Sequence, residues 1–159
     1  MRPRQAESRV ADFRRVIGSE MRAGETFRTM FPVLIPPPDV GGGWGPAAVI
    51  IPLFWAVRKS MWRRAVRATQ AQIGIPLRYR MVWGTTDQRV LIFAVRARWN
   101  LGPLITSVDR GDIVGATANT VGQGWRTVAL ELSGQRSLSV KVPAPWVDPI
   151  VNGFSQSDS

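Results

Sequence analysis

Apolar residues recur at helical spacing near the start of the chain, with charged side chains between them: Val10, Phe13, Ile17 and Met21. This spacing predicts an amphipathic helix over residues 6–21 that Gly24 ends. An apolar stripe has to be covered, so we expect the helix to dock on the domain that follows, with a partner or a bilayer as alternatives. Residues 1–24 are therefore predicted to form an N-terminal helix and tail.

Much of the remaining chain alternates between apolar and polar positions with a period of two, which is typical of half-buried strands. The alternating segments are residues 25–35, 78–83, 89–98, 104–108, 113–117, 125–132 and 136–142. Pro32 is expected to place the first strand at a sheet edge or to split it. Short strands joined by Gly and Asp turns predict an α+β protein that is mainly antiparallel β, a sandwich or open barrel. Residues 145–154 are expected to add a short helix before the polar tail, residues 155–159.

A long insertion, residues 44–73, interrupts the alternation. Pro46 suits the first turn of a helix, Pro52 should kink or restart it, and no further breaker occurs before Gly74. One long helix over about residues 46–73 is therefore predicted inside a single domain, residues 25–154. Its uncharged part, Ala47 to Val57, would cover roughly half of a bilayer core, so a complete membrane span is not expected. The pattern leaves open whether that part packs on its own sheet or inserts in lipid.

Positive charge is concentrated on this helix. The net charge is +10, and residues 40–86 contain seven basic residues and no acid. The helix carries five bases on one side, Arg58, Lys59, Arg63, Arg64 and Arg67, and two tryptophans beside its apolar face, Trp55 and Trp62. A helix with Arg on one face and Trp and Phe on the other is typical of helices that lie on anionic membranes. The alternative is an ordinary helix packed on a sheet, with the Arg stems lying along its edge.

Residue types that most catalytic sites need are missing. The chain has no Cys and no His, which excludes disulfides, thiol nucleophiles, zinc sites of thiolate or imidazole, and imidazole acid–base chemistry. The one close carboxylate pair, Asp109 and Asp112, lies in a Gly-containing turn, where Asp commonly serves the turn itself. The glycine-rich segments lack the residues of a phosphate-binding loop. We therefore predict no catalytic residues, no metal and no cofactor.

One hairpin resembles a known family. The segment TTDQRVLIF, residues 85–93, resembles the T-D-x-R-L-h-h-h hairpin of bacterial pleckstrin-homology-like domains, where h is apolar. The order downstream is also similar: a Gly-Pro turn, a strand leading into VDRGDI at residues 108–113, a glycine turn, two strands and a terminal helix. The likeness covers about residues 78–154 and is nearest to small actinobacterial members with a basic stretch before the hairpin. It implies a pleckstrin-homology-like fold and a non-enzymatic adaptor at membranes. The insertion at 44–73 and the short last helix depart from that pattern.

Three functions follow as hypotheses. The first is a cytoplasmic adaptor at the inner face of the cell membrane, which binds anionic lipid or a membrane protein through the five bases, with Trp55 and Trp62 inserted at headgroup level. The second is a nucleic-acid-binding β-barrel, in which Arg78, Tyr79 and Arg80 assist the basic helix. The third is a protein–protein adaptor whose charge is incidental. The sequence indicates neither the ligand nor the oligomeric state.

Overall fold

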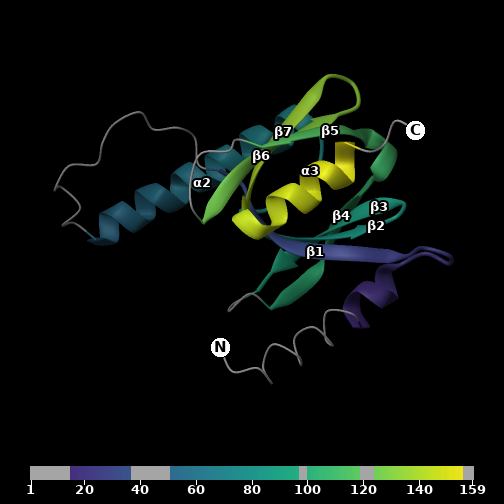
Figure 1. Ribbon diagram of the computed structural model, residues 1–159. Coiled ribbons are helices and arrows are strands. Elements are labelled where there is room, and N and C mark those ends of the chain that lie inside the picture. Colours follow the sequence, from purple (N-terminus) through teal and green to yellow (C-terminus); the bar gives the residue numbers. More distant parts are fainter. Residues whose placement is uncertain (1–14, 37–50, 97–99, 119–123, 156–159) are drawn as a thin grey trace.

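The computed structural model describes residues 15–36, 51–96, 100–118 and 124–155 (Figure 1), and of residues 51–58 and 155 it describes only the backbone. The seven strands are β1 (Phe27–Leu34), β2 (Arg80–Thr86), β3 (Arg89–Val95), β4 (Leu101–Asp109), β5 (Ile113–Ala118), β6 (Trp125–Leu132) and β7 (Arg136–Pro143). Beside the helical residues 15–20, the helices are α2 (Ile51–Ile73), α3 (Val147–Ser155) and the short turns η2 (Arg110–Asp112) and η3 (Ala144–Trp146).

The strands form one antiparallel sheet in the order β4-β3-β2-β1-β7-β6-β5. This confirms the predicted α+β class with mainly antiparallel β structure. A single residue pair, Leu34 opposite Lys141, joins β1 to β7 and so links a four-stranded half to a three-stranded half. The predicted bounds agree to within one residue for β5, β6 and β7, and they differ by two or three residues at one or both ends of β1, β2, β3 and β4.

The prediction that Pro32 marks an edge strand is wrong. Strand β1 lies between β2 and β7 and is not split, since Pro32 pairs with Val82 within a continuous register. A proline lacks the N–H that a ladder on both sides would need. The structure tolerates it because β1 pairs with β7 only at Leu34, which leaves the β7 side of β1 without a ladder at Pro32.

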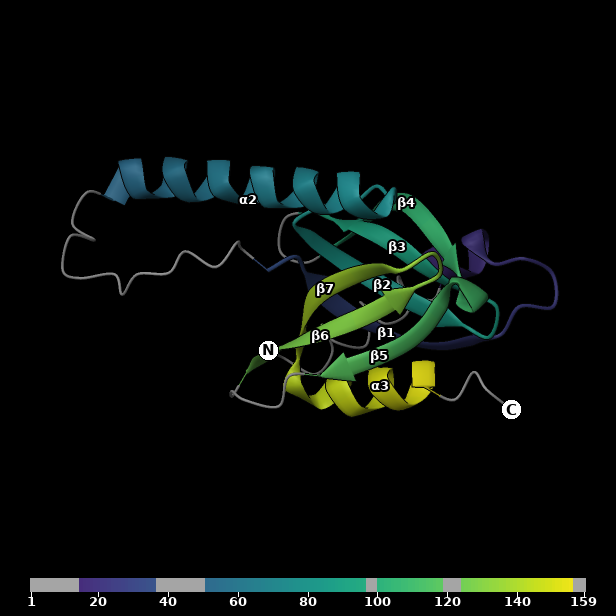
Figure 2. The ribbon, with the colours of Figure 1, turned by 90° about the horizontal axis from the view of Figure 1, so that it is seen from above.

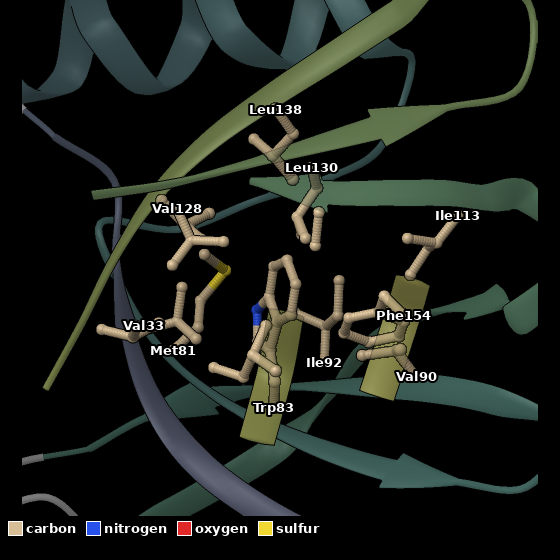
Figure 3. Close-up of a cluster of buried hydrophobic side chains, with 14 of the residues drawn as sticks. Val33, Met81, Trp83, Val90, Ile92, Ile113, Val128, Leu130, Leu138 and Phe154 are labelled. Atoms are coloured by element: carbon tan, nitrogen blue, oxygen red, sulfur yellow. The ribbon is translucent and has the colours of Figure 1, made fainter. Parts of the chain in front are cut away.

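The main hydrophobic core lies between the two halves of the sheet. Figure 3 shows Trp83, Met81 and Ile92 of one half facing Val128 and Leu130 of the other. Every inward position predicted on the last two strands is buried: Val128, Leu130, Leu132, Leu138, Val140 and Val142. Alternation predicts these positions because a strand with one covered face must place every second side chain in the core.

A second, smaller core covers the outer face of the four-stranded half. Residues 15–20 are helical, and Ile17, which is 2% exposed, packs against Leu91 and Phe93. The expected docking of the N-terminal helix on its own domain is thus confirmed for its last turns. Residues 6–14 of that predicted helix lie outside the described part of the chain.

A bulge at the start of β1 changes the face that Phe27 occupies. The alternation places Phe27 on the same face as Phe31 and Val33, yet Phe27 packs in the smaller core and the other two lie in the main core. The register explains the difference, because Phe27 pairs with Thr86 and Thr29 with the adjacent Thr85. An extra residue on one strand reverses the alternation at that point.

Helices α2 and α3 lie on opposite sides of the strands (Figure 2). Helix α3 packs on β5 and β6 and contributes Val147, Ile150 and Phe154 to the main core. Helix α2 contacts β7 near its C-terminal end, and its N-terminal part extends beyond the sheet (Figure 2). It ends before Gly74, whose φ of 70° suits a glycine. Residues 46–50 of the predicted helix lie outside the described residues.

Pro52 is the second described residue of α2, so the kink or restart predicted there falls at the boundary of the described residues and stays a prediction. None of the described helices is both long enough and apolar enough to span a membrane.

Candidate functional site

A groove runs between helix α2 and the segment that leads into strand β2. We call it the basic groove, and it holds about 730 Å³. Its lining residues are Lys59, Trp62, Arg63, Val66, Arg67 and Gln70 of the helix and Leu77, Arg78, Tyr79 and Arg80 of the opposite wall. The helix ends at Ile73 and the chain turns back through Gly74 and Pro76, which brings the second wall beside the first.

Helical spacing builds the first wall as two rows. Lys59, Arg63 and Arg67 follow one another at intervals of four residues and are all exposed. Trp62, Val66 and Gln70 form the neighbouring row and are half-buried. Side chains four residues apart lie on the same face of a helix, so one row supplies a cationic rim and the other supplies the floor.

The rim carries charge of one sign. Five of the lining residues are basic and none is acidic. Within the described part of the chain, Lys59, Arg63 and Arg67 have no ion-pair partner. Bases gathered around one groove without neighbouring acids produce a positive potential that attracts anions.

The floor is apolar at Trp62 and Val66, and contacts across the groove fix its position. The ring of Trp62 meets that of Tyr79 with 3.6 Å between centroids and 57° between planes. Gln70 donates from Nε2 to the carbonyl oxygen of Leu77 at 2.7 Å, which ties the helix to the opposite wall. Leu77 itself is buried in the main core. The Arg80 guanidinium lies 5.7 Å from the centre of the Tyr79 ring.

A third element holds the end of helix α2 in place. Arg136 of β7 donates from Nη1 to the carbonyl oxygen of Ile73 at 2.7 Å and from Nε to that of Ser133 at 2.9 Å. The last carbonyls of a helix lack intrahelical partners and carry partial negative charge, so a guanidinium there is favourable. This contact sets the direction in which the basic helix leaves the sheet.

The structure brings together four of the seven predicted binding residues, since Lys59, Trp62, Arg63 and Arg67 all line the groove. Arg64 is exposed on the same helix but does not line it. The side chains of Arg58 and Trp55 lie outside the described residues.

Trp62 has a different setting from the one expected. The sequence predicts its insertion at headgroup level, whereas its ring is half-buried against Tyr79 and forms part of the floor. Tyr79, Arg78 and Arg80, which the sequence connects with the nucleic-acid hypothesis, join the same groove. Sequence reasoning missed Gln70 and Leu77. The continuation of the row Trp62–Val66 by four residues could have indicated Gln70, whereas nothing in the pattern indicates the return of the chain at Leu77.

The polar residues of the Thr-Asp-x-Arg hairpin form hydrogen bonds that hold the turn and the neighbouring chain in place. Thr86 donates from its hydroxyl to Glu25 Oε1 at 2.6 Å and accepts from the backbone N–H of Gln88 at 3.2 Å. Asp87 accepts from the backbone N–H of Thr26 at 2.8 Å. These bonds form the turn and fasten it to the segment before β1, so the motif residues are used inside the fold.

Arg89, the last residue of the motif, completes a buried ion pair. It donates from Nε to Glu25 Oε1 at 2.9 Å and from Nη2 to Oε2 at 3.0 Å. The same Nη2 also donates to the carbonyl oxygen of Glu20 at 2.6 Å. The Arg89 hydrogen bonds, followed by that of Thr86, lower the pKa of Glu25 to about 2 against the opposing effect of burial.

The carboxylate pair considered in the sequence does not form a site. Asp109 and Asp112 are exposed at either end of the turn η2, and Asp112 accepts a hydrogen bond from the Ser133 hydroxyl at 3.1 Å. Among the residues that the structure describes, no three carboxylates gather where they could hold a metal ion.

Comparison with known proteins adds no relative: no protein-family model matches the chain, and a search of curated proteins finds no match. The function therefore has to be argued from the basic groove. Its arrangement is suited to attracting an anion and to sheltering an apolar group beside it.

Proposed function

We propose that this protein is a non-enzymatic, pleckstrin-homology-like binding domain that associates with anionic membrane surfaces through helix α2 and the basic groove. The observation that carries the proposal is the gathering of five bases and no acid around one groove. The proposed location is the inner face of the cell membrane, where anionic lipids are abundant.

The fold supports the proposed class. A four-stranded half followed by a three-stranded half, with a C-terminal helix packed on the core, suits the β sandwich or open barrel that the resemblance implies. Two features differ from that pattern: α2 is inserted between β1 and β2, and α3 has nine residues. The insertion supplies three of the five bases that line the groove, so the proposed binding surface depends on this addition to the sheet.

The electrostatics support reversible association. A base near an anionic membrane contributes about 1 kcal/mol, and this contribution falls off within a Debye length of about 8 Å at physiological salt. Helix α2 lies on the outside of the strands (Figure 2), and its exposed bases Lys59, Arg63, Arg64 and Arg67 are accessible to a flat surface. A few such contacts give binding that salt reverses.

Nucleic acid is the principal rival because phosphates attract the same bases. The groove is less suited to a nucleic acid than to an anionic lipid. Proteins that bind single strands stack bases on open aromatic faces, whereas Trp62 and Tyr79 pack against each other.

Flotation of the purified chain with vesicles tests the proposal. We expect it to float with phosphatidylglycerol vesicles and not with phosphatidylcholine vesicles, to be released by high salt, and to remain bound in the presence of an equimolar DNA duplex. Retention on the duplex without flotation would replace the proposal by nucleic-acid binding. Indifference to both would leave a protein partner as the explanation of the basic helix.

A further inference from the structure

The basic groove combines two chemistries in one concavity. Trp62, Val66 and Tyr79 form an apolar floor, and charged residues surround it on both walls. A surface that only attracts a membrane needs the charges, and it has no need of an apolar hollow between them. Ligand sites of about 300–1,000 Å³ hold small molecules, and the volume of about 730 Å³ falls in that range.

The helix stands away from the sheet along this groove. Over residues 61–70 the inner face of α2 is half-buried at best, whereas Ile73 is fully buried. Val66 touches the edge of the main core while it also lines the groove. Apolar side chains that a helix turns toward its own domain are normally covered, so this partial cover indicates room for an apolar occupant.

The polar groups of the groove favour an anion attached to an apolar chain. Gln70 is the one side-chain amide in the lining, and one hydrogen of its Nε2 is engaged by the Leu77 carbonyl. The other polar side-chain groups of the lining are the five bases, the Tyr79 hydroxyl and the Trp62 indole N–H, so cationic donors dominate its polar contacts. Cationic rims recognise phosphate or carboxylate, and an aliphatic and aromatic floor accepts methylene groups.

We propose that the basic groove binds a single anionic lipid molecule, with the phosphate of its headgroup against the rim and the first part of an acyl chain on the floor. This inference rests on the proposed function, because the membrane would supply the lipid. It goes further in assigning a defined site, whereas surface attraction requires only that the bases of α2 are exposed.

A lipid that is monomeric in water distinguishes binding at a defined site from attraction to a charged membrane surface. We would titrate the full chain with dihexanoyl phosphatidylglycerol below its micelle concentration, follow tryptophan fluorescence and heat, and use dihexanoyl phosphatidylcholine as the control. We expect saturable binding of the anionic lipid and weaker binding of the zwitterionic one.

Two charge variants on neighbouring turns of α2 test the location. Arg67→Glu changes a groove residue and Arg64→Glu an exposed residue outside it, with the same change in net charge. We expect Arg67→Glu to weaken binding of the monomeric lipid about tenfold and Arg64→Glu by less than about twofold. Both should weaken vesicle binding to a similar degree, since a flat surface meets the exposed bases of α2 whether or not they line the groove.

A third variant, Val66→Phe, fills the floor without changing any charge. We expect it to lose the monomeric lipid and to keep vesicle binding, provided that its thermal unfolding shows an intact fold. Should it fail to fold, the comparison of the two charge variants, both at exposed positions, decides the question.

The outcomes are distinct. Vesicle binding without monomer binding, or equal effects of Arg64→Glu and Arg67→Glu on the monomer, would overturn the defined site and leave the proposed function. Monomer binding without vesicle binding would retain the site and overturn the membrane association. Displacement of the lipid by a single-stranded oligonucleotide would assign the groove to nucleic acid and overturn the inference.

Discussion

Arg89 and Glu25, which lie 64 residues apart in the sequence, form a two-bond ion pair with Nε–Oε1 and Nη2–Oε2 distances of 2.9 and 3.0 Å. Arg89 begins β3 and Glu25 lies just before β1, so the pair joins the β2–β3 hairpin to the segment that follows the N-terminal helix. The Glu25 side chain is 0% exposed and that of Arg89 is 8% exposed. Thr86 of the same hairpin donates a third hydrogen bond to the carboxylate.

Removing one member of this pair should destabilise the fold strongly. We expect Arg89→Met to lower the free energy of unfolding by about 3 kcal/mol, because a buried carboxylate remains without its partner. The double variant with Glu25→Gln should lose less than Arg89→Met alone. Urea unfolding measures both, and equal stability of the wild type and Arg89→Met would contradict the assigned role.

Acid should remove the same stabilisation. The pKa of Glu25 is lowered from 4.5 to about 2, so the folded state holds its proton less readily than the unfolded chain does. The contribution is present in full above pH 4.5 and is lost as the pH falls toward 2. The difference corresponds to about 3 kcal/mol. Chemical unfolding between these pH values should show a steeper loss in the wild type than in Glu25→Gln, and parallel curves would refute the assignment.

A glycine on β4 should resist substitution because the neighbouring backbone is close. A Cβ at Gly102 would lie 2.8 Å from the carbonyl oxygen of Ala94. Gly102→Ala is therefore expected to cost about 1–3 kcal/mol, since strand β3 or β4 has to shift. Gly111→Ala, whose Cβ would meet nothing within 4 Å, is the matched control. Thermal unfolding distinguishes the two variants. An equal melting temperature would contradict the prediction, because it would show that the sheet accommodates the added methyl group without losing stability.

Alternation along the chain predicts the strands where one face is covered and the other is not. Residues 125–132 and 136–142 are predicted almost to the residue, because buried and exposed side chains alternate along β6 and β7. Strand β2 is less well predicted: residues 84–86 lie outside the predicted segment 78–83 but belong to the strand, where Thr86 uses its hydroxyl to hold Glu25. Polar residues buried by a distant partner leave no periodic signal.

Only one wall of the candidate site can be predicted from the sequence, because only that wall has a periodic pattern. Helical spacing places Lys59, Arg63 and Arg67 on one face from the sequence alone. The opposite wall depends on the return of the chain after Gly74, which brings Leu77 and Tyr79 beside the helix. That juxtaposition is tertiary, and no local pattern encodes it.

The position of the charges, rather than their number, is the central claim, and vesicle flotation tests it directly. The groove variant Lys59→Gln/Arg63→Gln/Arg67→Gln is compared with Arg22→Gln/Arg28→Gln/Arg96→Gln, which removes the same charge from exposed residues outside the groove. Flotation with phosphatidylglycerol vesicles at low salt should be abolished in the groove variant and largely kept in the control. Equal loss in both variants, or flotation of the groove variant at the wild-type level, would contradict the account.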